Sequence, residues 1–312
     1  MIYITGTRDI HLENTAVALG KFEGLHRGHQ LLFEEIKKQK AEGLKSVVFT
    51  FDMPPRSALS GDQSYQQIYT KEERRLLLEE MQIDILIEHP FTKEFAAQTP
   101  EEFVRDILVG RAGAKKVVVG KDFRFGKKRS GDVGLLKELA PKYGYELIVI
   151  EKLQMEHKDV SSTRVRAHLE KGEMEEAARL LGRPYAVIGE VVHGKALGRT
   201  IQIPTANQKA DKNKLMPPNG VYISRIYISG EEGCHYGITN VGVKPTVEEH
   251  AAKDVETNIV DFDGDIYGKT IKVELLHYRR PEMQFASLDE LRARIEIDVA
   301  AAVQYAEEHP AF

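Results

Sequence analysis

The chain has 312 residues, of which 42% are hydrophobic and 29% charged, and its formal net charge is −4. This composition excludes a disordered chain, and the length allows two domains with a core each. A slightly acidic chain has no long-range attraction for nucleic acid or anionic membranes, so we expect small molecules as partners. A single cysteine, Cys234, together with the lack of a secretory signal and of a membrane-length apolar run, predicts a cytoplasmic protein.

Up to about residue 180, short apolar runs alternate with helical periods. The runs predict strands over 16–19, 46–51, 84–87, 116–120 and 145–150, and the periods predict helices over 71–81, 100–108, 135–142, 163–171 and 174–181. This alternation predicts an α/β domain with a mostly parallel sheet, in which ligands bind beyond the carboxyl ends of the strands. Since Gly20, Asp52, His89 and Gly120 each follow such a strand, we expect them around one crevice.

The pattern changes after Gly182-Arg183-Pro184, which ends the helical period and predicts a boundary between domains at 1–182 and 183–312. Short runs with turns between them predict strands over 185–192, 220–228, 235–241, 256–261 and 269–276. We therefore expect an antiparallel β-barrel or sandwich. A helix over 287–305 finishes it, with Ser287 as N-cap and Glu290 at the capping-box position.

The most informative stretch reads GKFEGLHRGHQ, from residue 20 to residue 30. A strand, a glycine turn and a helix start make an anion site, because unpaired backbone N–H groups and the helix dipole favour phosphate. His26 and His29 stand at the helix start, where imidazoles can donate hydrogen bonds to oxygens that gain charge. We place Gly20, Phe22 and Gly28 in the same nucleotide site. An ordinary turn with surface histidines is the alternative.

Two further segments suit a nucleotide or its phosphates. Ser161 and Ser162 stand at a helix start, and Arg164 can contact phosphate oxygens with two N–H groups. The segment 119–131 sets two aromatic rings and five cations in a glycine-bounded loop, which can hold a flat heterocycle and its phosphate. The candidate binding residues of this loop are Asp122, Phe123, Arg124 and Phe125. A serine N-cap and a solvated basic loop are the plain alternatives.

An ordered series of motifs runs along nearly the whole chain: GKFEGLHRGHQ, VVVGKDFRFGKKRSGD, SSTRVR, LLGRPY, GRTIQIPTAN, ETNIVDFDGDIYG and RRPEMQF. This series resembles the bifunctional prokaryotic riboflavin kinase and FAD synthetase family. The resemblance implies a Rossmann-like HxGH nucleotidyltransferase domain that joins AMP from ATP to FMN, giving FAD and pyrophosphate. By matching position, His26 and His29 would hold the ATP phosphates, and Ser161, Ser162 and Arg164 would cover the leaving pyrophosphate. The FMN phosphate is already a nucleophile, so catalysis needs alignment and charge neutralisation, with Mg²⁺ helping.

The same resemblance implies a riboflavin kinase in the second domain, which makes FMN from riboflavin and ATP. PTAN would match a Mg²⁺ and ATP site, with Thr205 and Asn207 offering neutral oxygens to a hard cation. The preceding loop adds glycines and cations to the nucleotide site, namely Gly194, Lys195, Gly198 and Arg199. Glu282 occupies the position of the family's catalytic glutamate, which accepts the proton of the riboflavin alcohol as it attacks the γ-phosphorus.

Four positions depart from the family pattern. Glu23 stands where aspartate is usual and Pro54 where a histidine is usual, both in the first domain. Gln202 replaces a glycine and Asn258 a histidine in the second domain, but neither change removes Thr205, Asn207 or Glu282. The departures leave two alternatives open: a riboflavin kinase with a degenerate first domain, or a non-catalytic flavin-binding or regulatory protein.

Overall fold

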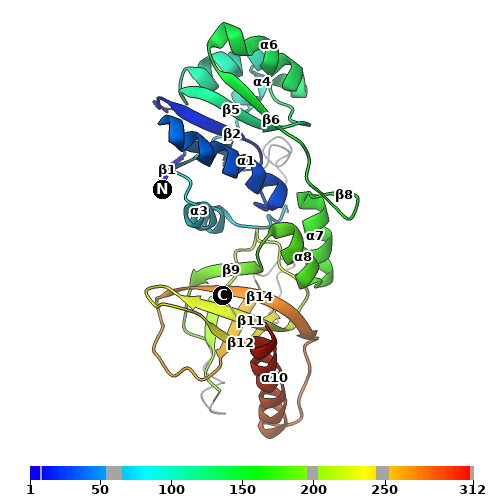
Figure 1. Cartoon of the computed structure of the whole chain (residues 1–312). Helices are drawn as coiled ribbons and strands as arrows, with labels where there is room; N and C mark the ends of the chain where they lie inside the picture. The colour runs from blue at the N-terminus through cyan, green and yellow to red at the C-terminus, as the bar shows by residue number, and fades with distance from the viewer. Residues whose placement is uncertain (8, 54–64, 195–202, 244–252, 310–312) are drawn as a thin grey trace. The chain divides into compact units, whose positions relative to one another are not determined.

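The computed structural model describes residues 1–7, 9–53, 65–194, 203–243 and 253–309 (Figure 1). The chain divides into two compact units, one of Met1–Tyr65 and Tyr69–Ser161, the other of Gln66–Ile68 and Ser162–Phe312. The sequence pattern places the boundary later, after residue 182. Helices α7 (Ser162–Lys171) and α8 (Met174–Leu181) account for the difference, because α8 packs on strands of the second unit and buries Met174 and Leu181.

The first unit contains a six-stranded sheet in the order β1-β4-β3-β2-β5-β6, and every pairing is parallel. The strands are β1 (Ile2–Thr5), β2 (Thr15–Leu19), β3 (Lys45–Phe51), β4 (Ile85–His89), β5 (Ala114–Gly120) and β6 (Glu146–Ile150). The predicted parallel sheet is confirmed. The apolar runs do not predict β1, an edge strand whose side chains are half-buried or exposed.

Helices and turns connect these strands, and a short hairpin follows them. Their bounds are α1 (Arg27–Lys38), η1 (Gln39–Glu42), α3 (Lys71–Glu80), α4 (Lys93–Ala97), α5 (Pro100–Glu102), η2 (Phe103–Val109), η3 (Lys127–Arg129), α6 (Val133–Tyr143), β7 (Gln154–Met155) and β8 (Lys158–Asp159). The predicted helix over 100–108 winds as a π-helix in η2, where the N–H of Gly110 bonds the carbonyl of Arg105.

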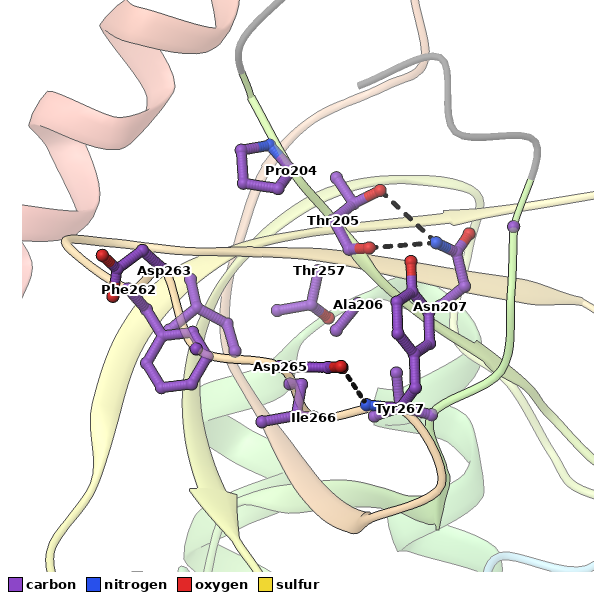
Figure 2. A pocket seen from close by; sticks show the side chains of 14 residues that line it. Pro204, Thr205, Ala206, Asn207, Thr257, Phe262, Asp263, Asp265, Ile266 and Tyr267 are labelled. Atoms are coloured by element: carbon purple, nitrogen blue, oxygen red, sulfur yellow. Dashed lines mark hydrogen bonds between the residues drawn. The ribbon is translucent and has the colours of Figure 1, made fainter. Parts of the chain in front are cut away.

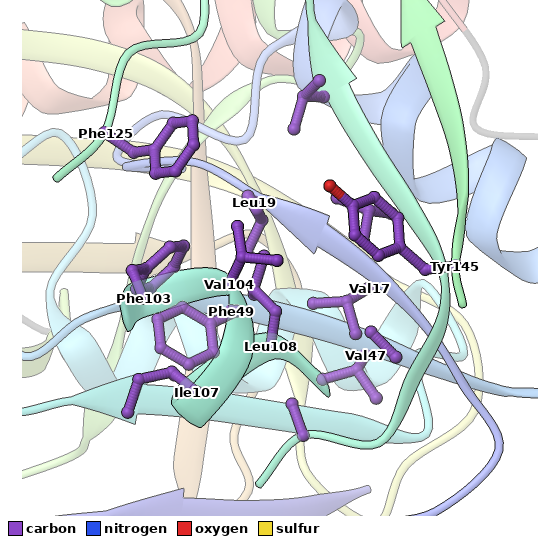
Figure 3. Close-up of a cluster of buried hydrophobic side chains, with 14 of the residues drawn as sticks. Val17, Leu19, Val47, Phe49, Phe103, Val104, Ile107, Leu108, Phe125 and Tyr145 are labelled. Atoms are coloured by element: carbon purple, nitrogen blue, oxygen red, sulfur yellow. The ribbon is translucent and has the colours of Figure 1, made fainter. Parts of the chain in front are cut away.

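The core of the first unit lies between one face of the sheet and η2. Val17, Val47 and Phe49 from the strands pack with Val104 and Leu108 of η2, and all are nearly inaccessible to solvent (Figure 3). Continuous apolar strands of this kind suit a parallel sheet that is covered on its faces. The core fixes the strands whose carboxyl ends carry the candidate site.

The second unit contains a six-stranded antiparallel sheet in the order β10-β13-β12-β11-β14-β9. Its strands are β9 (Tyr185–Glu190), β10 (Ala206–Lys209), β11 (Gly220–Ile228), β12 (His235–Gly242), β13 (Asp254–Ile259) and β14 (Thr270–Arg280). The N–H of Val192, just after β9, bonds the carbonyl of Asn207 in β10. This contact joins the two ends of the sheet, so the predicted barrel is confirmed and is nearly closed.

Helix α10 (Leu288–Glu308) ends the described chain, as predicted, with Ser287 as its N-cap. Its apolar side chains, including Val299 and Ala302, cover Val221 and Ile238 on the outer face of the barrel. Among the helices of the described residues, none combines the length and apolar character needed to cross a bilayer.

Candidate functional sites

In the first unit, the site lies where the strand order reverses. Strands β3 and β4 follow β2 in the chain and lie on one side of it in the sheet, whereas β5 lies on its other side. The crevice between β2 and β5 is therefore a topological switch point. Of the residues expected around this crevice, those that follow β2, β3 and β4 lie next to one another, as predicted. The N–H of Gly20 bonds the carbonyl of Phe49, and the N–H of Asp52 bonds that of His89.

The two histidines of the HxGH motif lie together at the start of α1. His26 is the N-cap, and its Nδ1 accepts a hydrogen bond of 3.3 Å from the backbone N–H of His29. The two rings stack with their centroids 3.6 Å apart and their planes 17° apart. Because Nδ1 of His26 is an acceptor, the neutral ring carries its proton on Nε2, which is then available as a donor.

Burial keeps both imidazoles neutral near pH 7. Loss of solvation lowers the pKa of His26 from 6.5 to about 4. Burial also lowers the pKa of His29 well below 6.5, and its neighbour His26 adds to the shift. The lowered pKa is that of the protonated ring, so near pH 7 each imidazole is neutral and can donate an N–H hydrogen bond to phosphate oxygens on which charge develops.

Glycines make room for this arrangement. A Cβ at Gly28 would lie 3.2 Å from the His26 ring, and a Cβ at Gly20 would lie 2.7 Å from the ring of Phe22. Phe22 is buried at a φ of 43°, and its ring contacts that of His29 edge-on at 5.1 Å. The predicted site residues of this turn therefore pack as one cluster, in which Phe22 supports the second imidazole.

The unusual Glu23 has a partner of its own. The hydroxyl of Tyr65 donates to its carboxylate at 2.7 Å. The glutamate side chain is one methylene longer than that of aspartate, and its carboxylate contacts the phenol of Tyr65 at the far end of the loop after β3. The other departure in this unit, Pro54, lies outside the described residues.

In the loop after β5, the structure separates four predicted binding residues. Phe125 packs into the core, whereas Phe123 is partly exposed and stacks on it at 5.6 Å. Arg124 pairs with Asp132, the N-cap of α6, at 2.8 Å, and Asp122 pairs with Lys152 at 3.1 Å. Phe123 is thus the ring that can meet a flat ligand, and the two charged side chains already hold partners in the protein.

The predicted helix start at SSTRVR is confirmed by α7, which begins at Ser162. Ser161 is the last residue of the first unit, and Ser162 and Arg164 belong to the second. Their predicted role against the pyrophosphate stays a prediction.

In the second unit, a cavity of about 340 Å³ opens beside the start of β10 (Figure 2). Three residues of the predicted nucleotide and metal site line it, namely Gly194, Thr205 and Asn207. The amide nitrogen of Asn207 donates to the backbone carbonyl of Thr205 at 3.1 Å and lies 3.4 Å from its hydroxyl. A Cβ at Gly194 would lie 2.5 Å from the amide oxygen of Asn207, so glycine leaves room for the amide in this position. Lys195, Gly198, Arg199 and Gln202 lie outside the described residues.

The opposite wall of the cavity comes from the segment between β13 and β14. Asp263, Asp265 and Tyr267 line it, and Asp265 accepts a hydrogen bond from the N–H of Tyr267 at 3.1 Å (Figure 2). The ring of Tyr267 stacks on His193 with centroids 3.9 Å apart. None of the site residues predicted from the sequence lies in this segment. The DFDGDIYG motif was the available signal, because it combines acidic residues with glycines and an aromatic ring.

Glu282 lies just beyond β14 and is held by two asparagines. The amide of Asn219 donates to one carboxylate oxygen and that of Asn240 to the other, each at 3.3 Å. A Cβ at Gly242 would lie 2.4 Å from Glu282 Oε1, so glycine leaves the room for this carboxylate. Burial lowers the pKa of nearby Lys253, and the charge of Glu282 opposes that shift. Sequence reasoning missed both asparagines, because they are distant in the chain.

One cross-strand row connects the two ends of this site. Directly paired residues run from Asn207 in β10 through Glu256, Asn240 and Val221 to Arg280 in β14. Paired residues on antiparallel strands project from the same face of a sheet. Asn207 and Asn240 are two strands apart in the row, a span of about 10 Å. The row thus places the Thr205 and Asn207 turn and the Glu282 carboxylate on the same face of the barrel.

Asn258, the remaining departure, supports the same turn. Its amide donates to the carbonyl of Pro204 at 2.9 Å, immediately before Thr205. An amide in place of the usual histidine therefore still contacts the backbone of the proposed metal site.

The donor set fits a magnesium ion that arrives with a nucleotide. Within the described residues, no cluster of three histidine, cysteine or acidic side chains has the geometry to hold a metal. Thr205 and Asn207 offer neutral oxygens, and Mg²⁺ is commonly held by few protein ligands together with substrate phosphates and water. The residues present thus suit a metal whose remaining ligands come from the nucleotide.

Family models match both parts of the chain. The model described as FAD synthetase matches residues 9–164, and the model described as riboflavin kinase matches residues 181–306. The chain is 34% identical to the bifunctional riboflavin kinase/FMN adenylyltransferase of Bacillus subtilis, over 97% of each chain. It is 34% identical to the protein of that name from Escherichia coli K12, over 94% of this chain and 93% of that one. A crystal structure described as a macrolide-efflux protein from Streptococcus pneumoniae is 32% identical, with a TM-score of 0.83 and 99% of each chain covered.

Proposed function

Because the chain belongs to the bifunctional riboflavin kinase/FMN adenylyltransferase family, we propose that it phosphorylates riboflavin in its second unit and transfers AMP from ATP to FMN in its first. The two reactions then occur in sequence, since the product of the kinase is the acceptor of the adenylyl transfer. The observation that carries the kinase assignment is the cross-strand row, which sets Glu282 and the Thr205 and Asn207 turn on one face of the barrel.

In the kinase reaction, Glu282 acts as the general base. The carboxylate accepts the proton of the terminal hydroxyl of riboflavin as the oxygen attacks the γ-phosphorus and ADP leaves. Asn219 and Asn240 hold one carboxylate oxygen each, which fixes the plane of the group toward the substrate. Thr205 and Asn207 would hold Mg²⁺, which would supply positive charge to neutralise the nucleotide phosphates. The cavity beside them takes the nucleotide.

In the adenylyl transfer, the protein supplies alignment and charge stabilisation. The FMN phosphate attacks the α-phosphorus of ATP, and the bond to pyrophosphate breaks. His26 and His29, both neutral, donate hydrogen bonds to phosphate oxygens at the start of α1, where the helix dipole also favours negative charge. Phe123 packs against the flavin ring. Both reactions consume ATP, which supports a cytoplasmic location.

Variants in one unit test this assignment, because the other unit provides a control in the same molecule. Glu282→Gln should lower FMN formation from riboflavin by roughly 10²- to 10⁴-fold, the usual contribution of a general base. FAD formation from supplied FMN should not change. Glu232→Gln, at an exposed loop position of the same unit, should leave both rates unchanged. Full kinase turnover by Glu282→Gln would contradict the role of the carboxylate.

A further inference from the structure

The glutamate of the GKFEGLHRGHQ turn is bonded to a tyrosine at the end of the loop after β3. We propose that Glu23 and Tyr65 form a positioning pair for the adenylyl transfer, which holds the turn so that His26 and His29 can donate to the nucleotide phosphates. The inference rests on the proposed role of the two histidines. It gives the loop after β3 a part in the reaction of the first unit.

The turn contains two residues in a backbone conformation that side chains other than glycine rarely adopt. Phe22 and Leu25 have φ values of 43° and 47°, in the left-handed region, and both are almost completely buried. In that region the Cβ atom comes close to the carbonyl oxygen, so such residues persist only where their surroundings hold them. Leu25 directly precedes His26, and its conformation therefore sets where the first imidazole lies.

Hydrogen bonds to the backbone hold the turn near its two ends. The hydroxyl of Thr50, in β3, donates to the carbonyl of Lys21 at 2.9 Å. The side-chain amide of Gln30, in α1, donates to the carbonyl of Leu25, also at 2.9 Å. Glu23 lies between these two points and projects a half-buried side chain. The middle of the turn is thus held through this carboxylate.

Tyr65 supplies the contact. Its hydroxyl donates to Oε2 of Glu23 at 2.7 Å, and both side chains are half-buried. A hydrogen bond to an ionised carboxylate is shorter and stronger than one between neutral groups, and partial exclusion of water strengthens it further. A tyrosine has only two side-chain torsions, so it loses little conformational freedom in making the bond. The pair ties the middle of the turn to a residue 42 positions later in the chain.

Helix α3 fixes the chain beyond Tyr65 within the same unit. Thr70 and Glu73 form a capping box at the start of this helix. Further along it, Nε of Arg74 donates to the carboxylate of Glu88 in β4 at 3.0 Å, and both side chains are buried. Breaking a buried ion pair would leave an uncompensated charge, so the helix is held firmly against the sheet. The loop after β3 therefore ends at a fixed helix, which keeps the phenol beside the turn.

The test uses the full chain and the variant Tyr65→Phe, which removes only the hydroxyl. We expect kcat for FAD formation from FMN and ATP to fall by roughly 10-fold, because a small misplacement of the groups at the reacting centre is costly. The KM values for FMN and ATP, and the rate of FMN formation from riboflavin, should stay within about twofold. The matched control is Tyr143→Phe, which removes a phenol–glutamate hydrogen bond of 2.7 Å elsewhere in the same unit and should change none of these values.

Variants of the glutamate show whether the two residues act through their shared bond. Glu23→Gln keeps an oxygen that can accept from Tyr65, so most of the rate of FAD formation should remain. Glu23→Ala removes the acceptor and should lower kcat at least as much as Tyr65→Phe does. Adding Tyr65→Phe to Glu23→Ala should then cause no further fall. Should Glu23→Ala fail to fold, Tyr65→Phe and Glu23→Gln still decide the matter.

Three results would overturn the positioning role. These are full kcat in Tyr65→Phe, an equal further fall in the double variant, and a raised KM for FMN with kcat retained, since the last would mean that the phenol binds substrate itself. A different result would refute the proposed function of the first unit, and this inference with it. That result is a wild type that forms FMN but no FAD, or a full rate of FAD formation in His26→Asn.

Discussion

The Nδ1 atom of His26 accepts the backbone N–H of His29, and the two imidazole rings stack at 3.6 Å. The first histidine of the HxGH motif is therefore the helix cap, and its neutral ring carries the proton on Nε2. The cap fixes which ring nitrogen carries the proton, and Gly28 leaves the space in which the ring lies. Sequence spacing predicts the proximity of the rings, and the cap explains their orientation.

Replacing either histidine should impair the adenylyl transfer alone. We expect His26→Asn and His29→Asn to lower FAD formation from FMN by roughly 10²- to 10³-fold, the usual effect of removing a donor to developing charge. FMN formation from riboflavin should not change, because the kinase groups belong to the other unit. The matched control is His11→Asn, since His11 is exposed. Equal rates of FAD formation in all variants would contradict the phosphate-binding role.

The buried histidine should also make the first unit sensitive to acid. The pKa of His26 is about 4 in the folded chain and 6.5 when unfolded, so the unfolded state takes up a proton first as the pH falls. The stabilisation that follows from keeping His26 neutral is complete above about pH 6.5 and is lost progressively as the pH falls to about 4. The wild type should lose up to about 3 kcal/mol more than His26→Asn across this range. Urea unfolding at several pH values measures the difference, and parallel curves would contradict the depressed pKa.

Gly242 should matter for the kinase because it makes room for Glu282. A methyl group there would lie 2.4 Å from the carboxylate oxygen and displace it. Gly242→Ala should lower kcat for FMN formation by roughly 10- to 100-fold. In Gly189→Ala the nearest atom lies at an ordinary 3.6 Å, so this variant should keep its rate. Equal rates in the two variants would show that Glu282 is not the carboxylate that acts in the kinase reaction.

The hydroxyl of Thr205 should set the metal requirement of the kinase. Thr205→Val keeps the shape of the side chain and removes one oxygen ligand. The Mg²⁺ concentration needed for half-maximal FMN formation should rise by about tenfold, which corresponds to the net worth of one such contact. Thr270→Val, at an exposed position of β14, is the control. An unchanged dependence of FMN formation on the Mg²⁺ concentration would show that the Thr205 hydroxyl does not bind the metal.

The sequence predicts features that depend on local patterns. Strands such as β2 and β3 follow from apolar runs, and α10 follows from its period and the Ser287 cap. It does not predict edge strand β1, in which no side chain is fully buried, or the π-helical winding of η2. It places α7 and α8 with the preceding strands because helices there continue the period, whereas their packing assigns them to the second unit.

In the candidate sites, too, the sequence predicts local features and misses contacts between distant segments. The HxGH turn and the PTAN turn are local, so their residues can be recognised along the chain. Asn219 and Asn240 reach Glu282 from 63 and 42 residues away, and Asp298 reaches Arg280 from a different element. These contacts depend on strand register and helix docking, which the pattern of one segment does not contain.

We propose that one chain converts riboflavin to FMN and FMN to FAD with ATP, each step in its own unit. The direct measurement is to incubate the purified full-length protein with riboflavin, ATP and Mg²⁺ and to separate the flavins over time. We expect FMN to accumulate first and FAD to follow, with Glu282→Gln blocking both products and His26→Asn stopping the series at FMN. Retention of riboflavin with no new flavin would contradict the account, and FMN without FAD would show that the first unit does not transfer AMP.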